Sequence, residues 1–346
     1  MLRALGFLLL PVVILGCKSI PIKGGIAEKQ LAPLEASYLS GYQKLYFQDQ
    51  QRNKTLETWT YYPVERRAPW IQPKGPYPWN RISDNGAMRS PREHKPLIVL
   101  SHGFAGSPDE FYWLIQPLVD AGYMVIATKH ADSPGPQVNH WNRALDVSFI
   151  LTEFLKTPMG QQVDQTKIGF TGFSLGGMTG IALAGARIGN LDAIVPNERY
   201  VRDPMITTDA RAALLGLNRE KMQSDLHDSR IKAAFLMAPA WSWVFYAKDV
   251  SQITIPIYIV AGDQDEVLVT ETNGLWYAEH IAKSRFQWVL GAGHFVFLGL
   301  PTCEGRTLVD PNGSMTFLYK DKPGVSRSYI QSHVARDAVA FFQANL

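Results

Sequence analysis

Cysteine is nearly absent from this 346-residue chain, which contains only Cys17 and Cys303. A framework of several disulfide bonds is therefore excluded, and no Cys/His cluster with zinc-ligand spacing is present. Runs of Lys or Arg are also missing, and at a formal net charge of +3 nothing in the sequence indicates a nucleic-acid partner. Internal repeats are absent as well. With 46% hydrophobic residues, the chain can bury one large core or two modest ones.

Long apolar runs are missing from the body of the chain, but a short one stands near the N-terminus. Residues 4–15 are apolar, follow a basic start, and are too few to span a bilayer comfortably. They lead into Ile14-Leu-Gly-Cys17, which resembles the lipoprotein box of bacterial signal peptides. The resemblance implies that residues 1–16 are removed as a signal peptide and that Cys17 carries a lipid anchor. The alternative is an ordinary secretory signal with an incidental cysteine.

The residues after Cys17 bear on where the protein is held. Lys18, in place of Asp, implies by the same resemblance sorting to the outer membrane of the bacterial envelope. If Cys17 is lipidated, Cys303 has no partner for an intramolecular disulfide, and we expect it to be buried rather than reactive. Residues 17–54 have the composition of a tether that ends in an ordering segment at 42–47.

From residue 55 to 346 the chain has the pattern of one α/β domain. Alternating apolar and polar residues predict a half-exposed strand at 56–62. Further strands are predicted at 97–100, 123–128, 166–171, 231–238, 257–261 and 286–290, and helices at 110–121, 142–156, 178–186, 270–283 and 328–345. Strands that alternate with helices and are continuously apolar indicate a mostly parallel sheet covered on both faces. Three insertions are expected, at about 64–96, 190–230 and 302–326.

The most informative motif is Gly172-Phe-Ser-Leu-Gly-Gly177, a G-x-S-x-G element between a predicted strand and a predicted helix. A serine on a sharp strand-to-helix turn projects its hydroxyl above the edge of the sheet. The flanking glycines permit a strained backbone and close packing of the helix. The N-terminus of that helix favours negative charge beside the serine. Ser174 is therefore the candidate nucleophile.

A serine hydroxyl needs a base within hydrogen-bond reach and a third group that orients the base. In this type of sheet, both should follow the serine in the chain and lie at strand ends. The strand at 257–261 leads into three acids, Asp263, Asp265 and Glu266, and the strand at 286–290 leads into His294. His333 is a weaker candidate base, because it lies within a predicted helix where an exposed histidine is the default.

Two further groups of residues allow competing interpretations. His130, Asp132 and His140 lie near one another in the sequence, but no H-E-x-x-H motif accompanies them, so loop histidines are favoured over a metal site. Aromatic residues follow the strand at 231–238 and fit either the core or the wall of a substrate pocket. They are Trp241, Trp243 and Phe245.

In these motifs the chain resembles an α/β-hydrolase, and more narrowly the bacterial group similar to platelet-activating-factor acetylhydrolases and predicted dienelactone hydrolases. The stretches that carry the resemblance are 96–108, 172–177, 228–234, 260–265 and 293–297. Dienelactone hydrolases use a cysteine nucleophile, and Ser174 argues against that activity. The group commonly has His before the nucleophile, where this chain has Phe173.

The resemblance also implies roles for single residues. The acid of this fold stands where Asp265 does, which leaves Asp263 to brace the turn. The loop after the strand at 97–100 should supply one oxyanion donor, the amide of Phe104, and the residue after the nucleophile the other, the amide of Leu175. His102 would then brace that loop rather than act as a base.

Together these features predict an α/β-hydrolase fold with cap and loop insertions and a serine hydrolase that cleaves esters through a Ser174–His294–Asp265 triad without a cofactor. The expected substrate is a small-molecule or lipid ester of short or medium acyl length. A serine peptidase or amidase of the same fold is the second candidate, and a catalytically silent envelope binding protein is the third. The sequence leaves the alcohol part of the substrate and the oligomeric state open.

Overall fold

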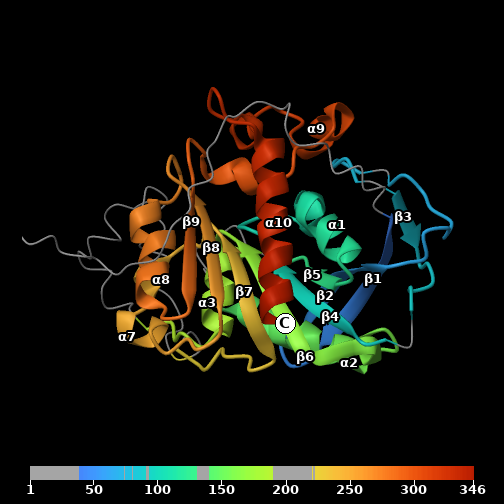
Figure 1. The fold of residues 1–346 in the computed structure, drawn as a ribbon, viewed down its shortest axis with the longest axis horizontal. Coiled ribbons are helices and arrows are strands. Elements are labelled where there is room, and N and C mark those ends of the chain that lie inside the picture. Colours follow the sequence, from blue (N-terminus) through green and yellow to red (C-terminus); the bar gives the residue numbers. More distant parts are fainter. Residues whose placement is uncertain are drawn as a thin grey trace, which may run out of the picture.

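The computed structural model describes residues 39–346, except for 74, 80, 91–92, 131–139, 190–219 and 221–222. Within that part of the chain, one nine-stranded sheet has the order β3-β1-β2-β5-β4-β6-β7-β8-β9 (Figure 1). The strands are β1 (Leu39–Asp49), β2 (Lys54–Pro63), β3 (Arg81–Asp84), β4 (Lys95–Ser101), β5 (Met124–Thr128), β6 (Val163–Phe173), β7 (Ile231–Met237), β8 (Ile257–Gly262) and β9 (Ser284–Val289). All neighbours from β5 to β9 are parallel, whereas β2 is antiparallel to both β1 and β5. The mostly parallel sheet is as predicted.

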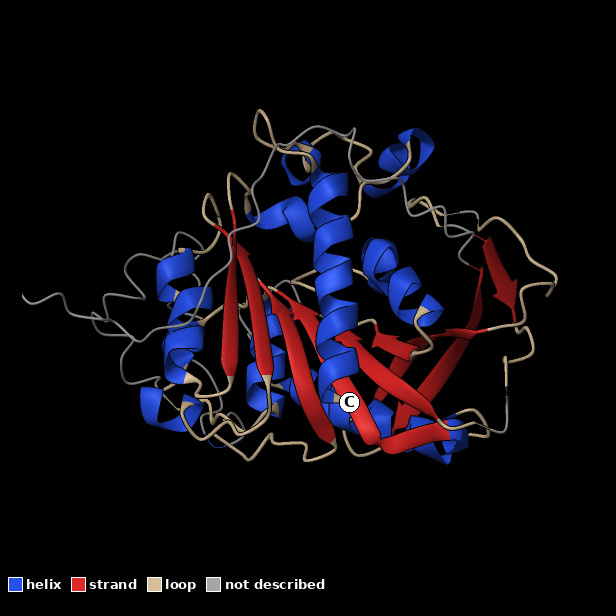
Figure 2. Ribbon diagram, in the orientation of Figure 1, coloured by secondary structure: helices blue, strands red, loops and turns tan. Residues whose placement is uncertain are grey.

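Helices cover both faces of this sheet (Figure 2). The α-helices are α1 (Tyr112–Asp120), α2 (Asn142–Lys156), α3 (Leu175–Leu183), α7 (Ala247–Val250), α8 (Gly274–His280), α9 (Cys303–Val309) and α10 (Arg327–Asn345). Short 3₁₀ turns include η1 (Pro108–Phe111), η4 (Ser242–Val244), η5 (Thr270–Thr272), η6 (His294–Phe297) and η7 (Thr316–Tyr319). Helices α1 and α10 pack together in front of the strands in Figure 1, and α3, which contacts α2, lies behind them.

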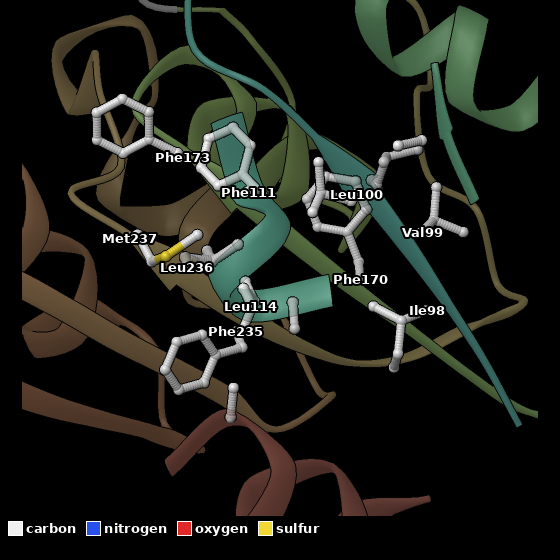
Figure 3. Close-up of a cluster of buried hydrophobic side chains, with 14 of the residues drawn as sticks. Ile98, Val99, Leu100, Phe111, Leu114, Phe170, Phe173, Phe235, Leu236 and Met237 are labelled. Atoms are coloured by element: carbon white, nitrogen blue, oxygen red, sulfur yellow. The ribbon is translucent and has the colours of Figure 1, made fainter. Parts of the chain in front are cut away.

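The core lies where the central strands meet the helices. Strands β4 and β5 are buried along nearly their whole length, because helices cover them on both faces and leave no side for solvent. Helix α10 buries Ile330, Val334, Ala338 and Phe342, which recur every fourth residue and so form one stripe. Figure 3 shows aromatic side chains of β6 and η1 within this core, Phe170, Phe173 and Phe111 among them. The core thus extends up to the residue that precedes Ser174.

The N-terminal boundary of the domain differs from the expectation. The segment at 42–47, expected to close a tether, forms the middle of β1 and pairs with β2 over its length. Among the described residues, the sheet therefore already includes Leu39, ahead of the expected start at residue 55. Residues 1–38, with the expected signal peptide, Cys17 and most of the tether, lie outside the described residues. In the described part of the chain, no helix combines the length and apolar character needed to cross a membrane.

The three expected insertions have different outcomes. The first, at 64–96, contains β3 and ends in the start of β4. Most of the second, at 190–230, lies outside the described residues. The third, at 302–326, contains α9 and η7, which we had not predicted. Cys303 begins α9 and is exposed, so the expectation of a buried thiol is wrong. It lies on an insertion at the surface rather than among the core strands.

Candidate active site

Ser174 occupies a strained turn between β6 and α3. Its backbone φ of 52° and ψ of −114° are sparsely populated for a residue with a side chain. The end of β7 holds the turn from both sides, since the Ser174 N–H donates to the Met237 carbonyl at 2.9 Å and the Ala240 N–H donates to the Ser174 carbonyl at 3.0 Å. A Cβ atom on Gly172 would overlap the Gly176 carbonyl. The G-x-S-x-G pattern is thus required by close backbone contact.

Positive φ angles recur around this turn. Of the seven non-glycine residues with positive φ in the described chain, four belong to the loops at this edge of the sheet: Ala105, Ser174, Ala238 and Trp241. Strained backbone of this kind persists only where the surrounding structure enforces it, and it concentrates at functional sites. The edge formed by the carboxyl ends of β4, β6 and β7 is therefore the candidate active site.

The predicted base and acid meet at the ends of β9 and β8. His294, the first residue of η6, donates from Nδ1 to Asp265 Oδ2 at 2.7 Å, and both side chains are buried. The other carboxylate oxygen of Asp265 accepts the N–H groups of Val267 and Leu268 at 2.9 and 2.7 Å. Backbone donors thus fix the carboxylate while it orients the imidazole. This leaves His294 Nε2 as the nitrogen available to a substrate or nucleophile.

The neighbouring acids have other partners. Asp263 is exposed and accepts the Gly291 N–H at 2.6 Å, which links the β8 loop to the β9 loop as the predicted brace. Glu266 accepts the His294 N–H at 3.3 Å and so holds the backbone of the base rather than its ring. The structure therefore places Asp265 alone among the three at the imidazole. His333 lies apart on α10, against the ring of Tyr329, where burial and the nearby Arg336 lower its pKa.

Phe173 connects the serine turn to the base. Its ring centroid lies 4.8 Å from that of His294 and 6.0 Å from those of Phe111 and Phe297, so the imidazole rests on a cluster of buried aromatic rings. Phe173, which stands where the resembled group commonly has His, thus packs against His294. Among the described residues, no hydrogen bond joins the Ser174 hydroxyl to His294. Free enzymes commonly have this bond long, and it shortens when substrate binds.

The loop after β4 passes over the serine turn. A Cβ atom on Gly103 would lie 3.7 Å from Ser174 Cβ and 2.9 Å from the Phe173 ring, so only glycine fits there. Neither the Phe104 N–H nor the Leu175 N–H donates a hydrogen bond to any described residue. Both predicted oxyanion donors therefore remain available, and Leu175 is also the first residue of α3, where the helix dipole favours negative charge.

His102 and Arg143 hold this loop from beneath. His102 Nε2 accepts the His130 N–H at 3.0 Å, so the ring proton resides on Nδ1, which donates to the Gly103 carbonyl at 2.7 Å. Arg143, buried at the start of α2, donates to the His102 carbonyl at 2.5 Å and to the Gly103 carbonyl at 2.8 Å. His102 thus has the bracing contacts we expected, and Arg143 is a support that the sequence analysis missed.

A second Ser–His–Asp array lies below that loop. Ser101 Oγ lies 2.9 Å from His130 Nε2, and His130 Nδ1 donates to Asp146 Oδ2 at 3.2 Å. Asp146 also accepts from Arg52 and Lys54, each at 2.6 Å. Burial alone would raise the pKa of Asp146, but His130 and Lys54 outweigh it and lower the pKa to about 2. All three members of this array are buried.

Two of the three residues of the competing metal hypothesis, His130 and His140, have other neighbours in the structure. His130 faces Ser101 and Asp146, while the His140 ring lies between those of Phe104 and Trp241, at 5.7 and 4.9 Å. Asp132 lies outside the described residues. In the part of the chain that the structure describes, no group of three His, Cys, Asp or Glu side chains is placed to hold a metal ion.

The predicted pocket aromatics divide between wall and core. Trp241 is partly exposed, and its ring lies beside that of His140. The His140 ring also contacts Phe104, which is 50% exposed. Trp243 is 1% exposed, although its ring contacts Trp241 at 5.4 Å. Phe245 is fully buried against Tyr277. Trp241 therefore lies on the solvent-accessible side of the candidate site. Phe245 belongs to the core, because η4 turns it inward.

Comparison with known proteins identifies the family of this chain. A family model described as the alpha/beta hydrolase family matches residues 98–302, which is more than half of the chain. The chain belongs to the alpha/beta hydrolase family. The match spans Ser174, Asp265 and His294, whereas β1 to β3 and α10 lie outside it. No curated protein matches the chain.

Solved structures show the same fold at low sequence identity. A ferulic acid esterase from Streptomyces cinnamoneus has a TM-score of 0.55 and 18% identity, over 89% of each chain. A putative dipeptidyl aminopeptidase IV from Bacteroides ovatus has a TM-score of 0.52 and 12% identity, over 91% of this chain and 37% of its own. At such identities the likeness establishes the hydrolase fold, and both an esterase and a peptidase are among the neighbours.

Proposed function

We propose that this chain is a serine ester hydrolase that works through an acyl-enzyme. The observation that carries the proposal is the buried Asp265–His294 hydrogen bond of 2.7 Å at the edge where the strained Ser174 turn stands. A solvent-accessible serine, an oriented imidazole and two amides without an acceptor among the described residues are the groups that acyl transfer requires.

In the proposed reaction, His294 Nε2 takes the Ser174 proton as Oγ bonds to the ester carbonyl carbon. The oxygen of the tetrahedral intermediate accepts from the Phe104 and Leu175 amides. The C–O bond to the alcohol then breaks, and the alcohol leaves with the proton held by His294. Water repeats the sequence on the acyl-enzyme and releases the acid. The carboxylate of Asp265 stabilises the imidazolium in both halves.

For the substrate, we propose an ester of short or medium acyl length, of the kind taken by enzymes similar to platelet-activating-factor acetylhydrolases. The partly exposed Trp241 and Phe104 supply apolar surface beside the serine, which suits a pocket of limited depth. A serine peptidase or amidase remains the second candidate, because the same triad serves both. A catalytically silent binding protein is disfavoured by the complete set of catalytic groups.

A series of nitrophenyl esters from acetate to palmitate, together with nitroanilides of the same acyl groups, tests this assignment. We expect kcat/KM to be highest for short or medium esters and much lower for every anilide. A kcat/KM that rises to palmitate with activation at an oil interface would replace the esterase with a lipase. Faster anilide cleavage would favour the peptidase, and no turnover of any substrate would favour the binding protein.

We further propose that the protein is a lipoprotein of the bacterial cell envelope, held through Cys17. Cys17→Ser should block lipid attachment, which metabolic labelling with a fatty acid measures directly. Cys303→Ser is the matched control and should leave labelling unchanged, because Cys303 stands in α9 far along the chain. Lipid incorporation that persists in Cys17→Ser would contradict the anchor.

A further inference from the structure

One insertion accounts for the net positive charge of this protein. Residues 64–96 contain seven Lys or Arg residues and three Asp or Glu residues, a net charge of +4, whereas the whole chain carries +3. The remainder of the protein is therefore close to neutral. A local excess of this kind directs a surface toward an anionic partner.

The described part of this insertion forms an ordered outer edge of the sheet. Strand β3 is the terminal strand at the right-hand margin of Figure 1, opposite β9 and α8. Ile71 pairs with Ile82 of β3 through two backbone hydrogen bonds of 2.8 and 3.1 Å. This pairing fixes the preceding residues against the edge, so that their side chains form a defined surface.

That surface combines cations with large apolar side chains. Arg66, Arg67 and Arg81 are exposed, and in the described chain none of them forms an ion pair. Trp70 is 48% and Ile71 is 54% exposed, and the Arg81 guanidinium lies 4.4 Å from the centre of the Trp70 ring. Two exposed acids, Glu65 and Asp84, accompany the cations. Exposed Trp beside Arg is typical of a surface that meets lipid headgroups.

The same edge is where the chain enters the fold. Leu39, the first described residue, pairs with Arg81, and Ser40 pairs with Pro63 on one side and Ile82 on the other. Residues 64–71 thus pass around the start of β1. An anchor upstream of Leu39 would raise the local concentration of this edge at the membrane, because the chain enters the fold there.

We propose that the surface formed by Arg66, Arg67, Trp70, Ile71 and Arg81 docks on an anionic phospholipid membrane. The proposal builds on the proposed envelope location, but the contact itself is made by the folded domain. Leu39 and Arg81 begin strands that run in the same direction as β6, whereas Ser174 follows the end of β6. Docking through their starting ends leaves the edge that holds Ser174 free for substrate.

Vesicle flotation of a chain that begins at Lys18 tests the contact without the lipid. This chain keeps residues 39–346 and with them every strand and helix that the structure describes. We expect it to float with vesicles that contain phosphatidylglycerol, to remain in solution with phosphatidylcholine alone, and to be released by salt. The triple variant Arg66→Gln, Arg67→Gln, Arg81→Gln should partition roughly a hundredfold less onto the anionic vesicles.

A matched variant removes three positive charges elsewhere. Lys232→Gln, Lys248→Gln, Lys283→Gln changes exposed lysines on β7, on α7 and before β9, on the side of the sheet away from β3, and should partition as the unchanged chain does. Both variants should keep the melting temperature and the ester-cleavage rate of the parent. Failure of the parent chain to bind anionic vesicles, or equal loss in both triple variants, overturns the proposal. Ester turnover and lipidation of Cys17 are read separately, so their failure is distinguished from failure of docking.

Discussion

The protein holds two sets of Ser, His and Asp side chains with opposite surroundings. Ser101, His130 and Asp146 are all buried and joined by hydrogen bonds, yet no residue of the set reaches solvent. Ser174, by contrast, is partly exposed on a turn with positive φ, next to two amides that have no partner among the described residues. The better-connected set is therefore the one that no substrate can reach.

The comparison shows what the buried array of Ser101, His130 and Asp146 lacks as a catalyst. Acyl transfer needs an accessible nucleophile and preorganised donors for the developing oxyanion, not only a serine beside a histidine. The buried array instead links the β1–β2 turn, through Arg52 and Lys54, to β4, the strand that precedes the predicted oxyanion loop. We interpret the buried array as structural support and the exposed set as the reactive centre.

Removing each serine gives the largest expected contrast. Ser174→Ala should lower kcat for a nitrophenyl ester by roughly 10⁴- to 10⁶-fold, as when other triad nucleophiles are removed. Ser101→Ala removes the same atom from the buried array, and we expect it to lower kcat by less than about tenfold, since it loses one buried hydrogen bond. The reverse ranking would assign the chemistry to the wrong serine.

Replacement of each aspartate by asparagine tests which carboxylate acts on His294. Asp265→Asn should lower kcat by about 10⁴-fold, because an amide cannot hold the His294 tautomer that accepts the serine proton. Asp263→Asn, the matched change in the same loop, loses only part of the brace to Gly291 and should stay within about tenfold of the parent. If Asp263→Asn is the more damaging change, the triad acid has been misassigned.

Replacement of Arg143 tests whether its hydrogen bonds to the loop after β4 affect the catalytic rate. Arg143→Gln leaves the His102 and Gly103 carbonyls short of donors, and we expect kcat to fall by about ten- to a hundredfold, less than for a lost oxyanion donor itself. KM should change little, since the loop does not lose a substrate contact. Arg187→Gln, on an exposed arginine, is the control. A change in KM alone would show that Arg143 shapes the binding pocket.

Asp146 gives the smallest effect on activity and the clearest effect on stability. Its pKa is lowered to about 2 in the fold, so its contribution is present above the ordinary pKa of 3.8 and is lost as pH falls toward 2. That contribution is about 2 kcal/mol. Asp146→Asn should lower the urea midpoint of unfolding at neutral pH, and the midpoint of this variant should fall less steeply as the pH is lowered. Asp120→Asn, which changes an exposed acid, should have the midpoint and the pH dependence of the parent. Parallel acid profiles for parent and Asp146→Asn would show that another group governs the decline.

Much of the fold was predictable because its central strands are apolar throughout and its helices carry regular stripes. The sequence also predicted Ser174, Asp265 and His294 as a triad, since each follows a buried strand in the order that this sheet type requires. The structure joins Asp265 to His294 by a hydrogen bond, and the catalytic role of the three residues stays a prediction. The short strand β3 and the helix α9 were not predicted, because they lie in insertions without regular apolar periodicity.

The supports beneath the oxyanion loop were missed for a different reason. Arg143 and Asp146 stand on α2 three residues apart, on the same face as Val147, Ile150 and Phe154, which are buried. Charged residues on an apolar helix face are a signal that they are paired inside the protein. Their partners, His102 and His130, come from other strand ends, and only the folded chain brings them together.

The most direct test of the central claim is reaction of the protein with a fluorophosphonate probe, followed by peptide mass spectrometry. We expect a single adduct on Ser174, its loss in Ser174→Ala, and its retention in Ser101→Ala. An adduct on Ser101, or continued labelling of Ser174→Ala, would contradict the assignment of Ser174 as the reactive serine.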